Sequence, residues 1–526
     1  MDSKLSNRSI GDTMRRPVFF VLSSLILVVS IGAILIGFEQ LPLIALGVFV
    51  LLIVTPIIVR GFFASILFLF LISLVIPLLA RFGPAGLANF QSLGKLGILG
   101  VSVSLWALSV LDGRSLKMSR PMAWFAIAWV VSFGFFLLRS LMDLSNGIAS
   151  QDVISSFQRF GFAYILLAIV TYDRLRDLRW VVGFLRLLVI CGIPVAIFGI
   201  FQWIVGPDAL QAIGMKNLTN VVDDFGYYSY SGMSLFRAFS TLSNHGDLAA
   251  FMIITILATL TLYWMGRLRL VWTILATGVM GVGLLVTQNV TGLVVLVCVL
   301  ALVVWLVGQY NGKRKKASFR RWRQILLFLL VLGVIFGVAF TNDEFRFRIV
   351  SSFTLGEGNP SLTSRFHILT TSLETFAAHP FGIGPDLEVL PNGVTMDVYL
   401  VFLLVTGGLP VFLFYIWLYV LPVLYGWRAL RTLRYNGRLP YIFYCVLWAW
   451  VAVGALIGGF TNSAVTTASP SNLIFWCGVG VLYKIPQLIS QATPEQFAEW
   501  GMREFRSLRV EGVGLPTKEL PQAGIS

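Results

Sequence analysis

The chain has 526 residues, of which 57% are hydrophobic and only 12% are charged, and its mean hydropathy is +0.85. No soluble core needs this much apolar surface, so the composition excludes a soluble globular protein and indicates a polytopic membrane protein. The formal net charge of +15 does not argue for nucleic-acid binding, because basic residues in short loops are what orients membrane helices.

The first apolar run, at 18–38, follows four basic residues and is too long for the core of a signal peptide, so it is predicted to be a transmembrane helix. The cysteines Cys191, Cys298, Cys445 and Cys477 all lie in apolar runs without CxxC spacing. This placement favours small buried side chains over a zinc site or a set of disulfides.

Windows of about 20 apolar residues predict about fourteen transmembrane helices, and therefore an all-α helical bundle in the membrane. The predicted spans are 18–38, 42–60, 62–80, 95–111, 121–141, 158–172, 180–203, 247–266, 269–287, 291–309, 324–341, 397–425, 440–460 and 470–485. The span at 397–425 is long for one crossing, and we expect Gly407, Gly408 and Pro410 to kink or break it.

The basic residues of the connections decide the predicted orientation. With the basic N-terminus in the cytoplasm, nearly every basic cluster falls on the cytoplasmic side, as the positive-inside rule requires. This predicts a transmembrane domain at 1–485 with both termini cytoplasmic and a cytoplasmic tail at 486–526. It also predicts two long outer loops, at 204–240 and 342–396, and long loops in compact proteins are usually functional or disordered.

The first outer loop combines tyrosines with charged residues. Tyr227 and Tyr228 suit the faces of sugars, although an aromatic belt at the membrane interface is an equally good interpretation. Asp223 and Asp224 could bind a divalent ion, but no third ligand is spaced to complete the site, so we expect no metal. Arg237 closes the loop just before the next span.

The second outer loop begins with Arg346 and Arg348 alternating with apolar residues, a pattern typical of a strand or of an interfacial segment. Apolar residues then recur at three- and four-residue steps over 361–378, which predicts an amphipathic helix that Ser361 can cap. Arg365 lies in the first turns of this helix.

The sequence His379–Pro380 is expected to end the amphipathic helix. Gly382 and Gly384 follow, and glycines at such positions allow the backbone to approach a ligand closely.

Arginines in outer loops indicate an anionic substrate, because a guanidinium binds phosphate with a bidentate fork and keeps its charge. Arg237 and Arg365 are the first candidates, Arg346 and Arg348 are further ones, and lipid-headgroup anchoring is the alternative for each. The middles of the spans carry almost no charge, and polar residues such as Gln202 sit at predicted outer ends. This distribution favours a reaction at the outer face over a conduction path.

Three segments in order resemble the O-antigen ligase and polymerase superfamily. They are RAFSTLSNHGDLAAF at 237–251, SRFHILTTSLETFAAHPFGIGPD at 364–386 and DVYLVFLLVTGGLPVFLF at 397–414. The resemblance implies a bundle of about twelve to fourteen helices in the bacterial cytoplasmic (inner) membrane. It also implies glycan transfer from a polyprenyl-diphosphate carrier at the outer face, without a cofactor.

Two departures from the family pattern bear on the activity. Ligases of the family commonly carry a histidine where this chain has Met396–Asp397. The family's Ser-Arg-x-Gly segment resembles residues 289–292, Asn-Val-Thr-Gly, which contain no arginine. The missing histidine favours a polymerase of polysaccharide repeats over a lipid A ligase.

The implied reaction is an inverting transfer in which an acceptor hydroxyl attacks the anomeric carbon and the diphosphate leaves. Arg237 and Arg365 would bind the diphosphate. Asp397 is the first candidate for a general base, followed by His379 and His245. Asp397 could instead cap the N-terminus of its span, and His245 could belong to a turn.

Three other functions stay open from the sequence: a ligase with a lipid or protein acceptor, a lipid-linked oligosaccharide transporter, and a structural membrane protein. A transporter would be expected to have charged residues in mid-span or two similar halves. A structural role would leave the polar outer loops unexplained. The resemblance also implies a pathway with a chain-length regulator and a glycan flippase as partners.

Overall fold

The computed structural model describes residues 62–82, 118–145, 161–215, 227–230, 233–242, 245–310, 360–384, 399–433, 438–460 and 470–491, and the single positions 100, 106, 333, 337 and 346. The predicted spans at 18–38 and 42–60 lie outside these residues, as do all but two positions each of the spans at 95–111 and 324–341 and nearly all of the predicted tail.

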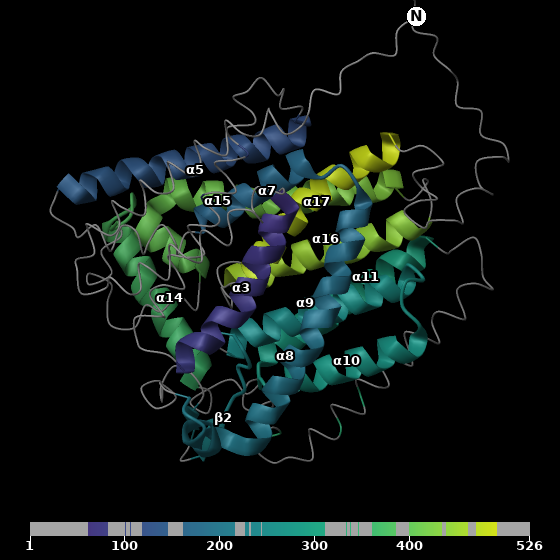
Figure 1. The fold of residues 1–526 in the computed structure, drawn as a ribbon. Helices are drawn as coiled ribbons and strands as arrows, with labels where there is room; N and C mark the ends of the chain where they lie inside the picture. Colours follow the sequence, from purple (N-terminus) through teal and green to yellow (C-terminus); the bar gives the residue numbers. More distant parts are fainter. Residues whose placement is uncertain are drawn as a thin grey trace, which may run out of the picture.

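Helices dominate the described part of the chain (Figure 1). They are α3 (Phe62–Phe82), α5 (Arg120–Ser145), α7 (Phe162–Arg174), α8 (Leu178–Ala212), α9 (His245–Trp264), α10 (Leu270–Leu285), α11 (Val290–Tyr310), α14 (Pro360–Ala378), α15 (Tyr399–Leu433), α16 (Arg438–Phe460) and α17 (Ser471–Gln491). Each one coincides with a predicted span or with the predicted amphipathic helix.

Six of these helices are long and apolar enough to cross a membrane: α5, α8, α9, α11, α15 and α17. Shorter apolar helices lie within α3, α10 and α16. The protein is therefore a multi-pass membrane protein of helical architecture, and the full count of fourteen spans stays a prediction.

A short hairpin interrupts the all-α architecture. Strands β1 (Tyr227–Tyr230) and β2 (Met233–Phe236) pair antiparallel, with Tyr227 opposite Phe236 and Tyr228 opposite Leu235. Aromatic residues favour strands, and three of the four residues of β1 are tyrosines. The hairpin lies within the predicted loop at 204–240.

Helix α9 is the centre of the bundle. It contacts α8, α10, α11, α16 and α17, and 94% of its most apolar window is buried, against 28% for α8 (Figure 1). A helix that is apolar on every side can be buried on every side. The central position of α9 therefore also fixes the position of its first residue, His245.

Small residues set the closest helix contacts on the other side of the bundle. A Cβ on Gly480 of α17 would lie 2.4 Å from the carbonyl oxygen of Ala168 in α7. A Cβ on Gly426 of α15 would lie 2.3 Å from the ring of Trp448 in α16. Membrane helices use glycine in this way, because close approach increases their dispersion contacts.

Two helices are broken at a glycine that lies one or two residues before a proline. Gly408 in α15 has φ 70° and ψ −178°, which confirms the predicted break in the long span. Gly206 in α8 has φ 74° and ψ 173°, and helix continues beyond it to Ala212. The first residues of the predicted outer loop at 204–240 are therefore helical, and Pro207 is compatible with the first turn of a new helical segment.

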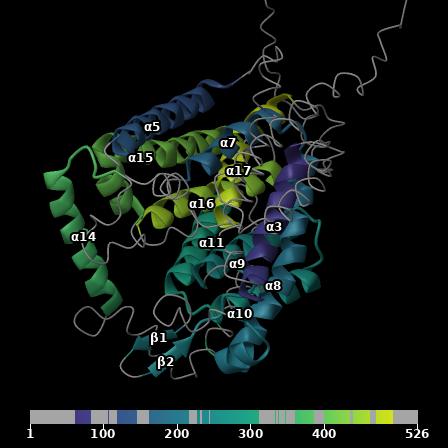
Figure 2. The same ribbon diagram turned by 60° about the vertical axis from the view of Figure 1, so that its left-hand side comes forward.

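Helix α14 lies at the margin of the molecule beside α15, and the hairpin lies at the lower end of the view (Figure 2). The helix begins at Pro360, so Ser361 is in its first turn and does not cap it. Proline is well tolerated there, since its missing N–H has no partner at a helix start. The helix ends before His379, as predicted.

Candidate functional site

Arg237 directly follows strand β2, at the end of the bundle where α8 and α10 end and α9 and α11 begin. The residue is only 7% exposed. The backbone N–H of its neighbour Ala238 donates to the carbonyl of Val286, just after α10, at 3.1 Å. Segment 237–242 thus lies against the bundle, although the sequence alone predicted only a loop.

Gln202 of α8 holds this segment in place. Its Oε1 accepts hydrogen bonds from the N–H groups of Phe239 at 3.2 Å and Ser240 at 2.6 Å, and its Nε2 donates to the Ser240 carbonyl at 3.1 Å. Gln202 and Ser240 are both fully buried. One amide therefore satisfies three backbone groups that would otherwise be buried without a partner.

Ser240 adds a second attachment. Its backbone is left-handed, with φ 56°, and its Oγ donates to the Val195 carbonyl of α8 at 2.5 Å. Gly199 leaves room for this contact, since a Cβ there would meet Ser240 at 3.5 Å and Leu248 at 3.2 Å. A strained backbone persists only where its surroundings fix it.

Arg237 contacts a predicted site residue directly. Its NH1 lies 2.7 Å from Nε2 of His245, the first residue of α9. Arginine can only donate, so Nε2 must carry the lone pair and the ring is neutral with its proton on Nδ1. The Nδ1 atom is buried and has no hydrogen-bond partner among the described residues.

Residues 289–292, at the start of α11, pack against the first turns of α9. Asn289 caps α11 by accepting the N–H of Gly292 at 3.0 Å. A Cβ on Gly292 would stand 3.1 Å from Cβ of Ala249 in α9. The Asn-Val-Thr-Gly segment thus has a capping and packing role here, which needs no arginine.

The second group of predicted residues lies around α14. His379 is exposed, and its backbone N–H donates to the carbonyls of Thr375 and Phe376. The backbone of Arg365 belongs to α14. Gly382 was expected to bring the backbone close to a ligand. In the structure its backbone lies close to α15, and a Cβ on Gly382 would be 2.4 Å from the Thr406 carbonyl oxygen.

The described contacts of these residues fall into two groups. Arg237 and His245 lie against α8, α9 and α10, whereas α14 packs on α15. The main chains of Tyr227 and Tyr228 are in β1. Asp397 and Arg348 lie outside the described residues.

Arg346 is described as a single helical and exposed position, against the strand-like alternation of its segment. Alternation over so few residues is a weak signal, and arginine is a good helix former.

Within the described residues, no group of three or more His, Cys, Asp or Glu side chains could hold a metal ion. The arrangement around Arg237 is suited to an anion, because a buried guanidinium next to a neutral imidazole keeps its positive charge.

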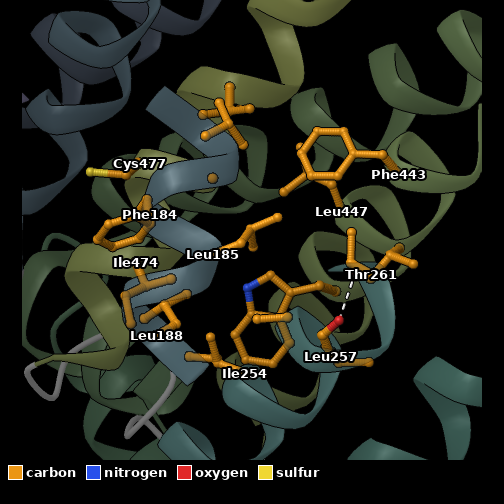
Figure 3. A pocket seen from close by; sticks show the side chains of 16 residues that line it. Phe184, Leu185, Leu188, Ile254, Leu257, Thr261, Phe443, Leu447, Ile474 and Cys477 are labelled. Atoms are coloured by element: carbon orange, nitrogen blue, oxygen red, sulfur yellow. Dashed lines mark hydrogen bonds between the residues drawn. The ribbon is translucent and has the colours of Figure 1, made fainter. Parts of the chain in front are cut away.

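Two cavities lie in the bundle, away from Arg237. One of about 110 Å³ lies between α8, α9, α16 and α17, lined by Phe184, Leu188, Ile254, Leu447 and other apolar residues (Figure 3). The other, of about 380 Å³, lies between α3, α7, α8 and α17.

Neither cavity fits a glycan. Residues 254–261 of α9, which border the smaller one, lie roughly 14–24 Å along the helix from His245. A sugar or a diphosphate needs several polar partners, and these walls are almost entirely apolar.

The sequence reasoning missed Gln202 as part of this site. The available signal was a polar side chain near the end of an otherwise apolar span. What the sequence could not supply was its partner Ser240, 38 residues later in the chain.

Comparison with known proteins adds one finding. Residues 275–416 match the sequence model of a protein family described as O-Antigen ligase. This range contains most of α10, all of α11 and α14, and the first half of α15, including its break. No curated protein matches the chain.

Proposed function

We propose that this chain, whose residues 275–416 match the O-Antigen ligase family, polymerises polyprenyl-diphosphate-linked oligosaccharide repeats at the outer face of the bacterial cytoplasmic membrane. The observation that carries the proposal is the buried Arg237, which Gln202 and Ser240 fix at one end of the bundle. A fixed cation is what a departing diphosphate requires.

The proposed reaction forms one bond and breaks another. The oxygen of an acceptor hydroxyl attacks the anomeric carbon of the donor, and the bond from that carbon to the diphosphate oxygen breaks. The electron pair leaves with the diphosphate, whose growing charge Arg237 and Arg365 neutralise. This leaving group needs no proton.

The proton of the acceptor hydroxyl passes to a carboxylate or to bulk water, and Asp397 is the proposed acceptor. We do not propose His245 as the base, since its Nε2 lone pair would already accept from Arg237. We assign His245 the role of holding the guanidinium in place. His379, exposed at the end of α14, is the second proposed base.

A size-resolved product analysis tests the proposal. The protein would be reconstituted in liposomes with a polyprenyl-diphosphate-linked oligosaccharide. We expect a ladder of repeat multiples from the wild-type protein. In Arg237→Gln, we expect a loss of about 10²–10³-fold in kcat, the usual effect of removing one transition-state donor. Arg237→Lys keeps the charge but not the fork, so it should retain intermediate activity.

Arg186→Gln is the matched control. Arg186 is an arginine of α8. Unlike Arg237, it is exposed, and it borders the larger apolar cavity. Its replacement should leave the ladder unchanged. A single transfer that requires a separate acceptor would show a ligase, and lipid movement between leaflets without any transfer would show a transporter.

A further inference from the structure

The break in α15 removes two hydrogen bonds of an ordinary helix. In an unbroken helix the N–H of Leu409 would donate to the Val405 carbonyl, and residue 410 would donate to the Thr406 carbonyl. The turn at Gly408 separates the first pair, and Pro410 has no N–H for the second. One N–H and two carbonyls in the middle of a long apolar helix therefore need other partners.

Residues 380–384, which we name the strap, supply all three partners. The N–H of Ile383 donates to Val405 at 2.9 Å, and the N–H of Gly384 donates to Thr406 at 3.1 Å. The N–H of Leu409 donates to the Pro380 carbonyl at 3.0 Å. The strap thus replaces the two missing helix bonds with three bonds to another segment.

Two glycines make this contact possible. Gly382 has φ 86°, and a Cβ there would lie 2.4 Å from the Thr406 carbonyl and 2.6 Å from the Gly408 nitrogen. Gly408 has φ 70°, and its Cβ would lie 2.3 Å from the Phe381 carbonyl carbon. Both the backbone conformation and the space exclude any side chain.

The broken turn of α8 shows that such a break does not by itself require a strap. Gly206 has nearly the same dihedral angles, but no atom of another described residue lies within 4 Å of its would-be Cβ. Its neighbours Trp203 and Ile204 are exposed, whereas Val405 and Thr406 are only 1% and 2% exposed. A buried break must be satisfied by protein, because an unpaired polar group in an apolar environment is costly.

The strap is also continuous with α14. Leu369 of α14 packs on the apolar cluster of Ile383, Val401 and Val405. Ser372, one turn later, is fully buried. The strap and this face of α14 therefore attach the whole amphipathic helix to the first half of α15.

We propose that Gly382 and Gly408 are positioning residues: through the strap they fix α14, with Arg365 and His379, relative to the broken turn of α15. This inference rests on the proposed function, since it assigns α14 the second cation for the donor diphosphate. A displaced α14 would bind the donor less well while Arg237 stays in place.

Hydrogen–deuterium exchange tests the strap without any activity assay. In the wild-type protein, the amides of Ile383, Gly384 and Leu409 should be protected. In Gly382→Ala and Gly408→Ala they should exchange at least about tenfold faster, while peptides from α9 and α17 stay protected. The matched control is Gly206→Ala, which imposes the same positive φ on an alanine without any collision.

The same variants then test the role in catalysis. We expect Gly408→Ala to raise the KM for the lipid-linked donor at least about tenfold, with a smaller change in kcat. Gly206→Ala should keep both constants within about twofold of the wild type. If Gly408→Ala does not fold, Gly384→Ala is the alternative, because that residue also has a positive φ, of 82°, and belongs to the same strap.

The outcomes separate the two proposals. Unchanged exchange in all strap variants would overturn the strap itself. Faster exchange with unchanged KM and kcat would overturn its role in positioning. A wild-type protein that shows protected strap amides but no glycan transfer would overturn the proposed function and leave the strap standing as a structural element.

Discussion

The contact between Arg237 and His245 restricts the histidine to one protonation state. Because Arg237 donates to Nε2 at 2.7 Å, protonation of that atom would place two N–H donors against each other. The imidazole therefore acts as an acceptor for the guanidinium. This role requires an acceptor atom at the right place and does not require a titratable group.

Replacing His245 separates the two possible roles. His245→Gln keeps an acceptor oxygen for Arg237, so we expect kcat/KM within about fivefold of the wild type. His245→Leu removes the acceptor and should lower kcat/KM about 10–100-fold. A general base typically contributes about 10²–10⁴-fold, so an equal and large loss in both variants would instead identify His245 as the base. Initial rates over a donor concentration series measure the difference.

Gln202 gives a second test at the same scale. Gln202→Leu leaves the N–H groups of Phe239 and Ser240 buried without their acceptor, and each such group costs about 1–3 kcal/mol. We expect a lower thermal midpoint in detergent together with reduced transfer. Gln211→Leu, an exposed position on the same helix, is the control and should leave both unchanged. A Gln202→Leu protein of normal stability and activity would contradict the role of this amide.

These residues show what the sequence could and could not predict. Arg237 stood out because an arginine in a predicted outer loop suits an anionic substrate. Gln202 stood out only as a polar residue at a span end, because its partner Ser240 is distant in sequence. Periodicity and spacing describe local structure, so they cannot identify a contact between residues that far apart.

At the scale of elements, glycines divide into those that could be replaced and those that could not. Gly478 and Gly480 lie two residues apart in α17. Gly478 borders the smaller cavity. Among the described residues, a Cβ on Gly478 would contact Leu447, at an ordinary distance of 3.4 Å. A Cβ on Gly480 would lie 2.4 Å from the Ala168 carbonyl of α7.

We therefore expect opposite effects from the same substitution. Gly478→Ala should stabilise the protein by roughly 0.5–1 kcal/mol, because alanine loses less backbone freedom in a helix than glycine. Gly480→Ala should destabilise it by about 1–3 kcal/mol, because α7 and α17 must separate. Thermal unfolding of the two purified variants in one detergent measures both. Equal shifts would contradict the close packing of α7 on α17.

The break in α15 was predictable because Gly and Pro interrupt helices by local chemistry. The extension of α8 beyond its break was not predicted, since the polar residues after Gly206 resemble a loop. The amphipathic helix at 361–378 was predicted from its period and is observed at Pro360–Ala378. Its attachment to α15 was not, because backbone hydrogen bonds between segments leave no periodic signal.

At the scale of the molecule, the predicted orientation can be measured directly. The strap end of α14 should face outward and the α9–α10 turn should face the cytoplasm. Phe381 is 75% exposed and Arg269 is also exposed, so both positions can carry a label. In a background with all four native cysteines replaced, Phe381→Cys should react with a membrane-impermeant maleimide in intact cells, and Arg269→Cys only after lysis.

The reverse labelling pattern would overturn the orientation and with it the outer location of the site. Labelling of both positions in intact cells would show a different number of crossings between them. The apolar composition predicted a membrane protein without any structural information, because no soluble fold buries so much apolar surface. How the two groups of site residues lie relative to each other depends on helix packing, which the span pattern does not encode.

The strap has a consequence for how the protein is built. Residues 380–384 are synthesised before α15, yet the groups that they satisfy exist only once α15 is in the bilayer with its turn at Gly408. If α15 entered alone, one N–H and two carbonyls would face lipid, at a cost of several kcal/mol. Residues 380–384 must therefore be at the membrane when α15 inserts. Because they are also synthesised first, the order of assembly follows the order of synthesis at this turn.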